Sequence, residues 1–132
     1  MTRILIIDDS AFQRNRVRRA TKAAGYELLE AANGREGLEV AATARPDCIL
    51  LDLLMPEMGG EEFLEVLRDR ELDIPVIVLT ADVQESTRQQ CMELGAATFI
   101  NKPMQETELL DAINRVLDVA AAEKEAANDN DA

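Results

Sequence analysis

Acidic residues stand at the ends of two apolar segments of this 132-residue chain. Asp52 closes the segment "CILLD" (48–52), and Asp8 and Asp9 end the segment "RILIIDD" (3–9). Carboxylates in such positions can bind a hard divalent cation such as Mg²⁺. A carboxylate can also attack a phosphoryl group and form an aspartyl phosphate. Metal binding would require these three carboxylates to meet in space.

Two further polar side chains stand at the ends of apolar segments nearer the C-terminus. Thr80 closes "PVIVLT" (75–80), and Lys102 comes directly after "ATFIN" (97–101). Phosphoryl transfer depends mainly on positioning and on neutralising the charge of the equatorial oxygens. With Mg²⁺ on one of these oxygens, the Lys102 ammonium could bind a second and the Thr80 hydroxyl a third.

The elements that must position these residues alternate along the chain. Short segments rich in large aliphatic residues are typical of strands covered on both faces of a parallel sheet. They lie at 3–8, 26–31, 48–52, 75–80 and 97–101. Longer segments with apolar residues three and four apart predict helices near 11–24, 33–42, 63–67, 84–94 and 109–120. The order predicts an α/β fold, a doubly wound five-stranded parallel sheet with helices on both faces.

In an open parallel sheet, ligands bind outside the carboxyl ends of the strands. The predicted strands bring three carboxylates, a hydroxyl and an amine to that edge. Two like charges about 4 Å apart repel by roughly 4 kcal/mol at an effective dielectric constant of 20. Either some carboxyl groups stay protonated or a cation neutralises them, and Mg²⁺ suits such oxygen ligands.

Each of these residues also has a simpler structural interpretation. Asp8 and Asp9 could cap the following helix, because aspartate is a favoured N-cap. Thr80 could be a turn residue and Lys102 a surface charge. The Lys102-Pro103 pair could simply mark the end of the strand. Alternatively, it could form a cis bond that points the lysine inward. Their combination, each at a predicted strand end, favours a site.

Composition excludes several classes of function. The formal net charge of −12 and the 3% of aromatic residues disfavour direct binding to nucleic acid. The chain has no histidine, which excludes Ser-His-Asp catalysis and histidine-ligated zinc. We expect no leader and no membrane-spanning segment, and we expect Cys48 and Cys91 to be buried thiols. We therefore expect a cytoplasmic protein with no membrane contact.

The length predicts one domain over residues 1–120. Residues 121–132, "AAEKEAANDNDA", lose the large apolar side chains and end in small and acidic ones. We expect a frayed helix end and a disordered acidic tail there.

The segments "ILIIDDS", "CILLDLLMPEMGGEEFL", "PVIVLTA" and "ATFINKP" together resemble the receiver domain of two-component response regulators, over about residues 2–120. The resemblance implies a flavodoxin-like sheet of strand order 2-1-3-4-5. It implies that Asp52 is the phosphoacceptor. It also implies Mg²⁺ bound directly by Asp9, Asp52 and the main-chain carbonyl of Leu54, with Asp8 acting largely through water.

The same resemblance assigns Thr80 and Lys102 to the phosphoryl group and places Phe99 at an aromatic switch position. On the sequence alone, plain core is the favoured interpretation of Phe99. One departure is Gly59-Gly60, where the family often has Asp-Gly, and we expect a weaker cap of the third helix.

The resemblance implies a signalling switch that accepts phosphate from a histidine kinase or a histidine phosphotransfer protein. Because the chain ends soon after the fifth predicted helix, we expect a stand-alone receiver. It would bind a downstream protein through the face formed by helix four, strand five and helix five. The basic cluster of the first helix could be a kinase docking surface or a solvated face. That cluster comprises Arg14, Arg16, Arg18, Arg19 and Lys22.

Three other functions remain as alternatives. A phosphorelay intermediate would pass the phosphoryl group onward. A phosphohydrolase of the haloacid dehalogenase type would need a second acid two residues after the nucleophile, where this chain has Leu54. A flavin-binding module would need a phosphate-binding loop after the first strand, where Asp8 and Asp9 would repel the phosphate.

Overall fold

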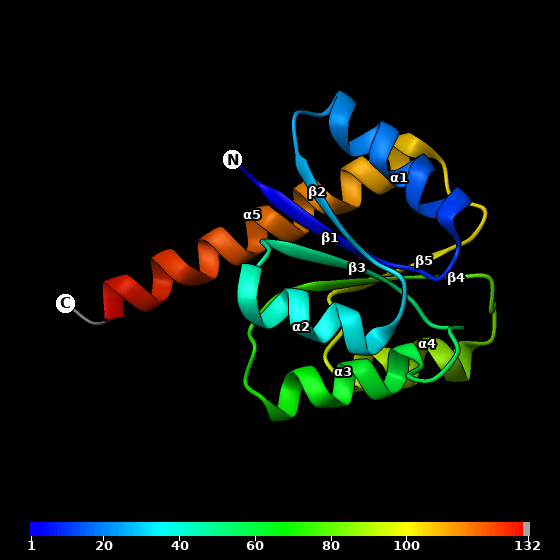
Figure 1. Ribbon diagram of the computed structural model, residues 1–132. Helices are drawn as coiled ribbons and strands as arrows, with labels where there is room; N and C mark the ends of the chain where they lie inside the picture. The colour runs from blue at the N-terminus through cyan, green and yellow to red at the C-terminus, as the bar shows by residue number, and fades with distance from the viewer. Residues whose placement is uncertain (131–132) are drawn as a thin grey trace.

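The computed structural model describes residues 1–130, and side chains up to residue 126. Strands and helices alternate along the chain, as the sequence predicts (Figure 1). The strands are β1 (Arg3–Ile7), β2 (Glu27–Ala31), β3 (Cys48–Asp52), β4 (Val76–Thr80) and β5 (Thr98–Asn101). The helices are α1 (Ala11–Ala23), α2 (Gly34–Ala44), α3 (Gly60–Asp69), α4 (Glu85–Glu93) and α5 (Glu106–Asn130).

The five strands form one parallel sheet in the order β2-β1-β3-β4-β5. This order confirms the predicted doubly wound, flavodoxin-like α/β fold. Asp52 lies opposite Leu79 and Thr80 opposite Asn101 in the register of the strands. The carboxyl ends of β3, β4 and β5 therefore meet at the same edge of the sheet.

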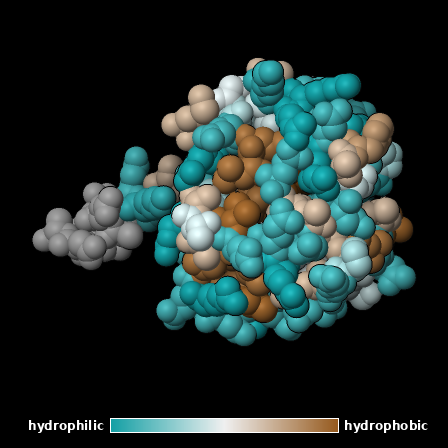
Figure 2. Space-filling view, in the orientation of Figure 1, coloured by the Kyte–Doolittle hydropathy of each residue, from teal (hydrophilic) through white to brown (hydrophobic). Residues whose placement is uncertain are grey.

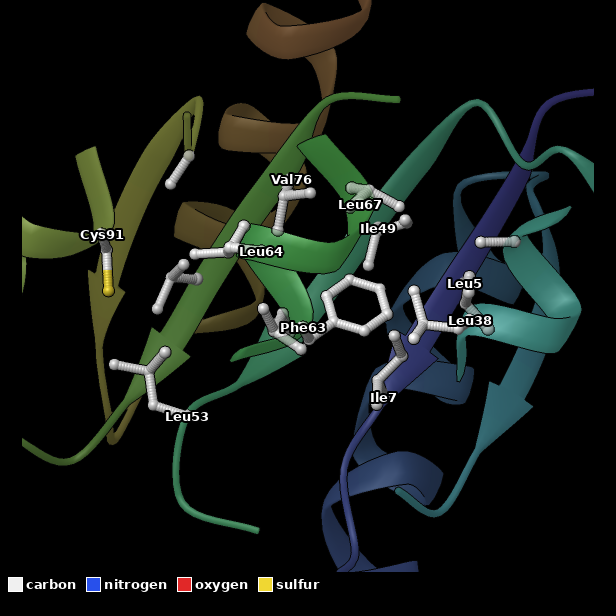
Figure 3. Close-up of a cluster of buried hydrophobic side chains, with 14 of the residues drawn as sticks. Leu5, Ile7, Leu38, Ile49, Leu53, Phe63, Leu64, Leu67, Val76 and Cys91 are labelled. Atoms are coloured by element: carbon white, nitrogen blue, oxygen red, sulfur yellow. The ribbon is translucent and has the colours of Figure 1, made fainter. Parts of the chain in front are cut away.

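The sheet separates two hydrophobic layers (Figure 1). Helices α2, α3 and α4 cover one face, and α1 and α5 cover the other. In the first layer the ring of Phe63, from α3, lies among Ile7, Leu38 and Ile49, so that three elements converge on one side chain (Figure 3). Phe63 is fully buried, and a buried aromatic of this size contributes a large share of the hydrophobic stabilisation. The strands are thus fixed from both sides.

The ends of the helices follow local sequence signals. The Ser10 hydroxyl accepts a hydrogen bond from the Gln13 N–H at the start of α1, so Ser10 is the N-cap where the sequence left Asp8 and Asp9 as candidates. The Asn33 side chain caps α2 in the same way. In contrast, Gly59 supplies no side-chain cap to α3, which agrees with the expected weaker cap.

Helix α5 continues to Asn130, past residue 120, where the sequence suggests that the domain ends. Figure 1 shows its C-terminal half extending beyond the sheet. The frayed, disordered tail expected for residues 121–132 stays a prediction, and residues 131–132 lie outside the described part.

The surface is mainly polar. The face shown in Figure 2 is largely hydrophilic, with smaller hydrophobic areas between the charged residues. Among the helices described, none is both long and apolar enough to cross a membrane. Cys48 and Cys91 are free and buried, and burial raises the pKa of the Cys48 thiol to about 12 and that of Cys91 to about 11.

The close approach of α3 to the end of β3 requires Gly60. A Cβ atom there would lie 2.9 Å from the Leu53 Cα and 3.0 Å from the Asp52 carbonyl oxygen. Because these are backbone atoms, we expect Gly60→Ala to lower the free energy of unfolding by about 1–3 kcal/mol in urea titrations. Gly59→Ala is the matched control: its Cβ would meet nothing nearer than the Leu53 carbonyl oxygen at 3.5 Å, so its loss should stay below about 1 kcal/mol. Equal losses in the two variants would contradict the steric explanation.

Candidate functional site

Three carboxylates meet at the carboxyl edge of the sheet. One oxygen from each of Asp8, Asp9 and Asp52 lies within 4.8 Å of the other two. Asp8 and Asp52 are buried, with 2% and 7% of their surface exposed, whereas Asp9 is exposed. The cluster is therefore open to solvent on the side of Asp9.

The strands determine where these carboxylates lie. Asp52 is the last residue of β3, and Asp8 follows directly after β1, the neighbouring strand. The Asp8 N–H still donates to the carbonyl of Ala31 at 3.1 Å, which continues the pairing of β1 with β2 by one residue. Both side chains are thus fixed by the sheet.

Lys102, which directly follows β5, supplies positive charge to the cluster. Its Nζ lies 3.1 Å from Asp8 Oδ2 and 3.6 Å from Asp52 Oδ1, and 17% of its side chain is exposed. The Lys102 N–H donates to the Thr80 carbonyl at 2.7 Å, and the Lys102–Pro103 peptide bond is cis. One ammonium therefore lies within ion-pair distance of two carboxylates.

Burial raises the pKa of the Asp52 carboxyl above its ordinary value. The Lys102 ammonium opposes this shift, while the negative charges of Asp8 and Asp9 add to it. Without a cation to offset these effects, ionised Asp52 is thus less favourable than a solvated aspartate.

Thr80 lies at the same edge, and its side chain is fully buried. Its hydroxyl accepts a hydrogen bond from the Asp82 N–H at 3.1 Å. The Asp82 carboxylate in turn accepts from the Gln84 N–H at 2.9 Å and from the Thr87 hydroxyl at 2.8 Å. These two bonds hold the pKa of Asp82 below its ordinary value. The Asn101 side chain donates to the Asp82 carbonyl, which ties the loop after β4 to β5.

Leu54 and Phe99 occupy different surroundings. The Leu54 N–H donates to Asp52 Oδ1 at 3.4 Å, while its side chain is 67% exposed. Phe99, on β5, is half-buried and packs against the hydrophobic layer on the α3 and α4 side. Among the described residues, no hydrogen bond or ion pair joins either side chain to the acidic cluster.

The first helix adds contacts that the sequence does not predict. Ser10 N–H donates to Asp8 Oδ1 at 2.9 Å, and the guanidinium of Arg14 donates to the Asp8 carbonyl at 2.7 Å. Of the basic cluster on α1, Arg14 is therefore turned toward the site, whereas Arg16 and Arg19 are exposed. No spacing in the sequence suggests this contact, because Asp8 lies before the helix and Arg14 is a long, flexible side chain.

The donor set suits a hard divalent cation. The three grouped oxygens are all carboxylate oxygens, and Mg²⁺ prefers such ligands together with water. The repulsion between three carboxylates exceeds what the single ammonium of Lys102 can neutralise. The residues present therefore fit a magnesium site.

Comparison with known proteins identifies the class to which this fold and site belong. Residues 4–114 match the response regulator receiver domain family. The chain is a receiver domain of two-component signalling and belongs to that family. Receiver domains are phosphorylated by histidine kinases, bind Mg²⁺ in an acidic pocket and act on downstream targets.

Individual relatives agree with this class. The chain is 36% identical to the chemotaxis protein CheY of Thermotoga maritima over 115 residues, 86% of this chain and 96% of that protein. It is 41% identical to the phosphate regulon transcriptional regulatory protein PhoB of Pseudomonas aeruginosa over 116 residues, 86% of this chain and 51% of that protein. The chain thus spans about half or less of the length of several curated relatives that it matches. The structure of the chemotaxis protein CheY4 of Vibrio cholerae superimposes with a TM-score of 0.83 at 36% identity, covering 88% of this chain and 98% of that one.

The raised pKa of Asp52 predicts a pH-dependent stability. An unfolded aspartate has a pKa of about 3.9, so ionised Asp52 lowers stability above its higher folded pKa, and this penalty disappears as the pH falls toward about 4. We expect Asp52→Asn to raise the free energy of unfolding at pH 7, without divalent ions, by an amount on the order of 1 kcal/mol. The gain should vanish near pH 4 in urea titrations.

The exposed Asp73, in the loop before β4, provides the control for this prediction. Asp73→Asn should leave the free energy of unfolding almost unchanged at both pH values. A loss of stability in Asp52→Asn at pH 7 would mean that the attraction of Lys102 outweighs the burial of the carboxylate.

Proposed function

We propose that this receiver domain accepts a phosphoryl group on Asp52 from a histidine kinase or a histidine phosphotransfer protein, in a reaction that requires Mg²⁺. The observation that carries the proposal is the position of the Asp52 carboxylate. It stands 3.6 Å from the Lys102 ammonium, grouped with the carboxylates of Asp8 and Asp9. A nucleophile, a cationic group and metal ligands thus stand together.

Asp52 is the nucleophile in this proposal. One of its carboxylate oxygens forms the new bond to phosphorus, and the P–N bond of the partner's phosphohistidine breaks with its electron pair leaving on the imidazole. The histidine belongs to the partner, because this chain contains none. Lys102 neutralises charge on one oxygen of the phosphoryl group, as an ammonium fixed beside the acceptor can do without reorganisation.

Asp9, Asp52 and the Leu54 carbonyl would hold Mg²⁺ directly, and Asp8 would act largely through water. When bound, the ion offsets negative charge on the carboxylates and on the incoming phosphoryl group. The exposure of Asp9 supports this assignment, because it leaves the cluster open toward solvent, where a phosphodonor can approach.

Thr80 and Phe99 are the proposed switch. The Thr80 hydroxyl would donate to the phosphoryl group, and movement of Thr80 toward that group would break the hydrogen bond that it accepts from the Asp82 N–H. The loop that follows β4 then changes, and Phe99, half-buried on β5, has room to turn inward. The downstream protein would bind the face formed by α4, β5 and α5 in the changed form, which shifts the population toward that form.

Exposed apolar side chains support docking of a protein donor at this edge. Phe12, Leu54 and Val83 are 70%, 67% and 78% exposed. Each lies within four residues of a strand-end residue of the site. They follow the carboxyl ends of β1, β3 and β4. A donor protein that covered these side chains on docking would remove apolar surface from water, which stabilises association. Whether the receiver acts alone stays a prediction.

Labelling with a small phosphodonor tests the acceptor. With an acyl phosphate or phosphoramidate and Mg²⁺, we expect one phosphoryl adduct per chain, stable in acid and labile in base, detected by intact-mass spectrometry. Asp52→Asn should lack it, and Asp73→Asn should keep it. Equal labelling of Asp52→Asn and the parent would contradict the assignment of the acceptor.

The role of Lys102 predicts a separate loss. In Lys102→Gln the side chain keeps a polar end without positive charge, so we expect phosphorylation of Asp52 to slow by about 100-fold at saturating Mg²⁺. Lys124→Gln, on the exposed part of α5, removes the same charge and should label at the parental rate. The measurement is the initial rate of adduct formation. Parental rates in Lys102→Gln would exclude the ammonium from the transfer step.

A further inference from the structure

Arg14 connects α1 to the end of β1. Its guanidinium Nη1 donates to the Asp8 carbonyl at 2.7 Å, and its Nε lies 3.2 Å from Glu30 Oε1. The side chains of Arg14 and Glu30 are 20% and 27% exposed, so both are half-buried. One planar guanidinium thus contacts the backbone beside the site and a carboxylate on the neighbouring strand.

The Asp8 carbonyl belongs to the peptide group that joins Asp8 to Asp9. Because a peptide group is planar, an interaction that fixes this oxygen also fixes the direction in which Asp9 begins. The other groups of Asp8 are already engaged: the N–H donates to Ala31, and the carboxylate accepts from Ser10 and Lys102. Arg14 therefore completes the positioning of the Asp8–Asp9 pair.

Glu30 holds Arg14 in this position. It lies on β2, opposite Ile6 of β1 in the register of the sheet, and it also pairs with Arg18. Arg14 and Arg18 are four residues apart on α1, so their side chains lie on the same face of the helix. Glu30 thus binds both arginines and fixes α1 against the edge strand β2.

We propose that Arg14, held by Glu30, is a positioning residue for the metal site: it orients the Asp8–Asp9 peptide and thereby raises the affinity for Mg²⁺. This inference rests on the function proposed above. Arg14 itself contacts neither the metal nor the phosphoryl group. Lysine cannot replace it, because a single ammonium lacks the planar set of donors that reaches both the carbonyl and the carboxylate.

Electrostatics alone predicts the opposite effect. A positive side chain close to a cation site repels the cation, so removal of the Arg14 charge should tighten Mg²⁺ binding if Arg14 acts only through its field. A positioning role predicts weaker binding. The direction of the change therefore separates the two explanations.

The experiment measures Mg²⁺ affinity by isothermal titration calorimetry and Mn²⁺ affinity by the electron paramagnetic resonance signal of the free ion. We expect Arg14→Gln and Arg14→Lys to weaken binding on the order of tenfold, as loss of a residue that orients a metal ligand typically does. Glu30→Gln, which leaves Arg14 without its ionic partner, should weaken binding by a smaller factor. The amide resonance of Asp9 should shift in all three variants before metal is added.

Arg35→Gln is the matched control. Arg35 is exposed at the start of α2, which follows β2, and it makes no ion pair among the described residues, so its loss removes the same charge without touching Asp8 or Glu30. Urea titration in metal-free buffer shows whether each variant is folded. If Arg14→Gln does not fold, Glu30→Gln and Arg14→Lys decide the question.

Two results would overturn the inference. Affinities in the folded variants equal to, or tighter than, that of Arg35→Gln would show that Arg14 does not position the acids. If the parent protein itself bound neither Mg²⁺ nor Mn²⁺, the proposed function would fail together with this inference. Metal binding by the parent therefore tests the proposed function, and the affinities of the variants test the positioning role of Arg14.

Discussion

The repulsion between three carboxylates at one sheet edge is the constraint on which the rest of this structure depends. Asp8 and Asp52 are buried, Asp9 completes the group, and Lys102 offers one positive charge against three negative ones. Such a cluster tends to spread apart or to take up protons. The rigid sheet prevents the first response. Burial, with a smaller contribution from the charges of Asp8 and Asp9, raises the pKa of Asp52 in the direction of the second. In the function proposed here, a divalent cation would relieve the repulsion and leave Asp52 ionised as the nucleophile.

The hydrophobic layers matter to function because they hold the strand ends in register. β1 and β3 are buried on both faces, so a shift of either strand would disturb both layers at once. Gly60 allows α3 to approach the end of β3 closely. The acids are therefore placed by packing that extends far from them, which explains how an unfavourable cluster persists in a folded protein.

Much of this arrangement could be predicted from the sequence, because its signals are local. Continuous apolar runs mark the strands to within a residue, and strand ends identify the acidic group. Glycines with positive φ angles, Gly25 and Gly95, follow the ends of helices α1 and α4. The contacts of Arg14 with Asp8 and Glu30 could not be predicted, because a long flexible side chain can reach several partners. The sequence predicts a helix end past residue 120 but not how far α5 continues, since the alanine-rich segment carries no packing signal.

The bond from the Asp82 N–H to the Thr80 hydroxyl has a consequence for background signalling. Two further bonds to Asp82, from Thr87 and Asn101, strengthen the same arrangement of the loop after β4. A hydrogen bond contributes about 1 kcal/mol net, so in the proposed switch each of them would reduce the spontaneous population of an alternative loop form roughly fivefold. If Thr80 acts as the proposed switch, these bonds would hold the protein in its resting form when no phosphoryl group is bound. Sequence changes at Thr87 or Asn101 would then alter the level of signalling without phosphorylation.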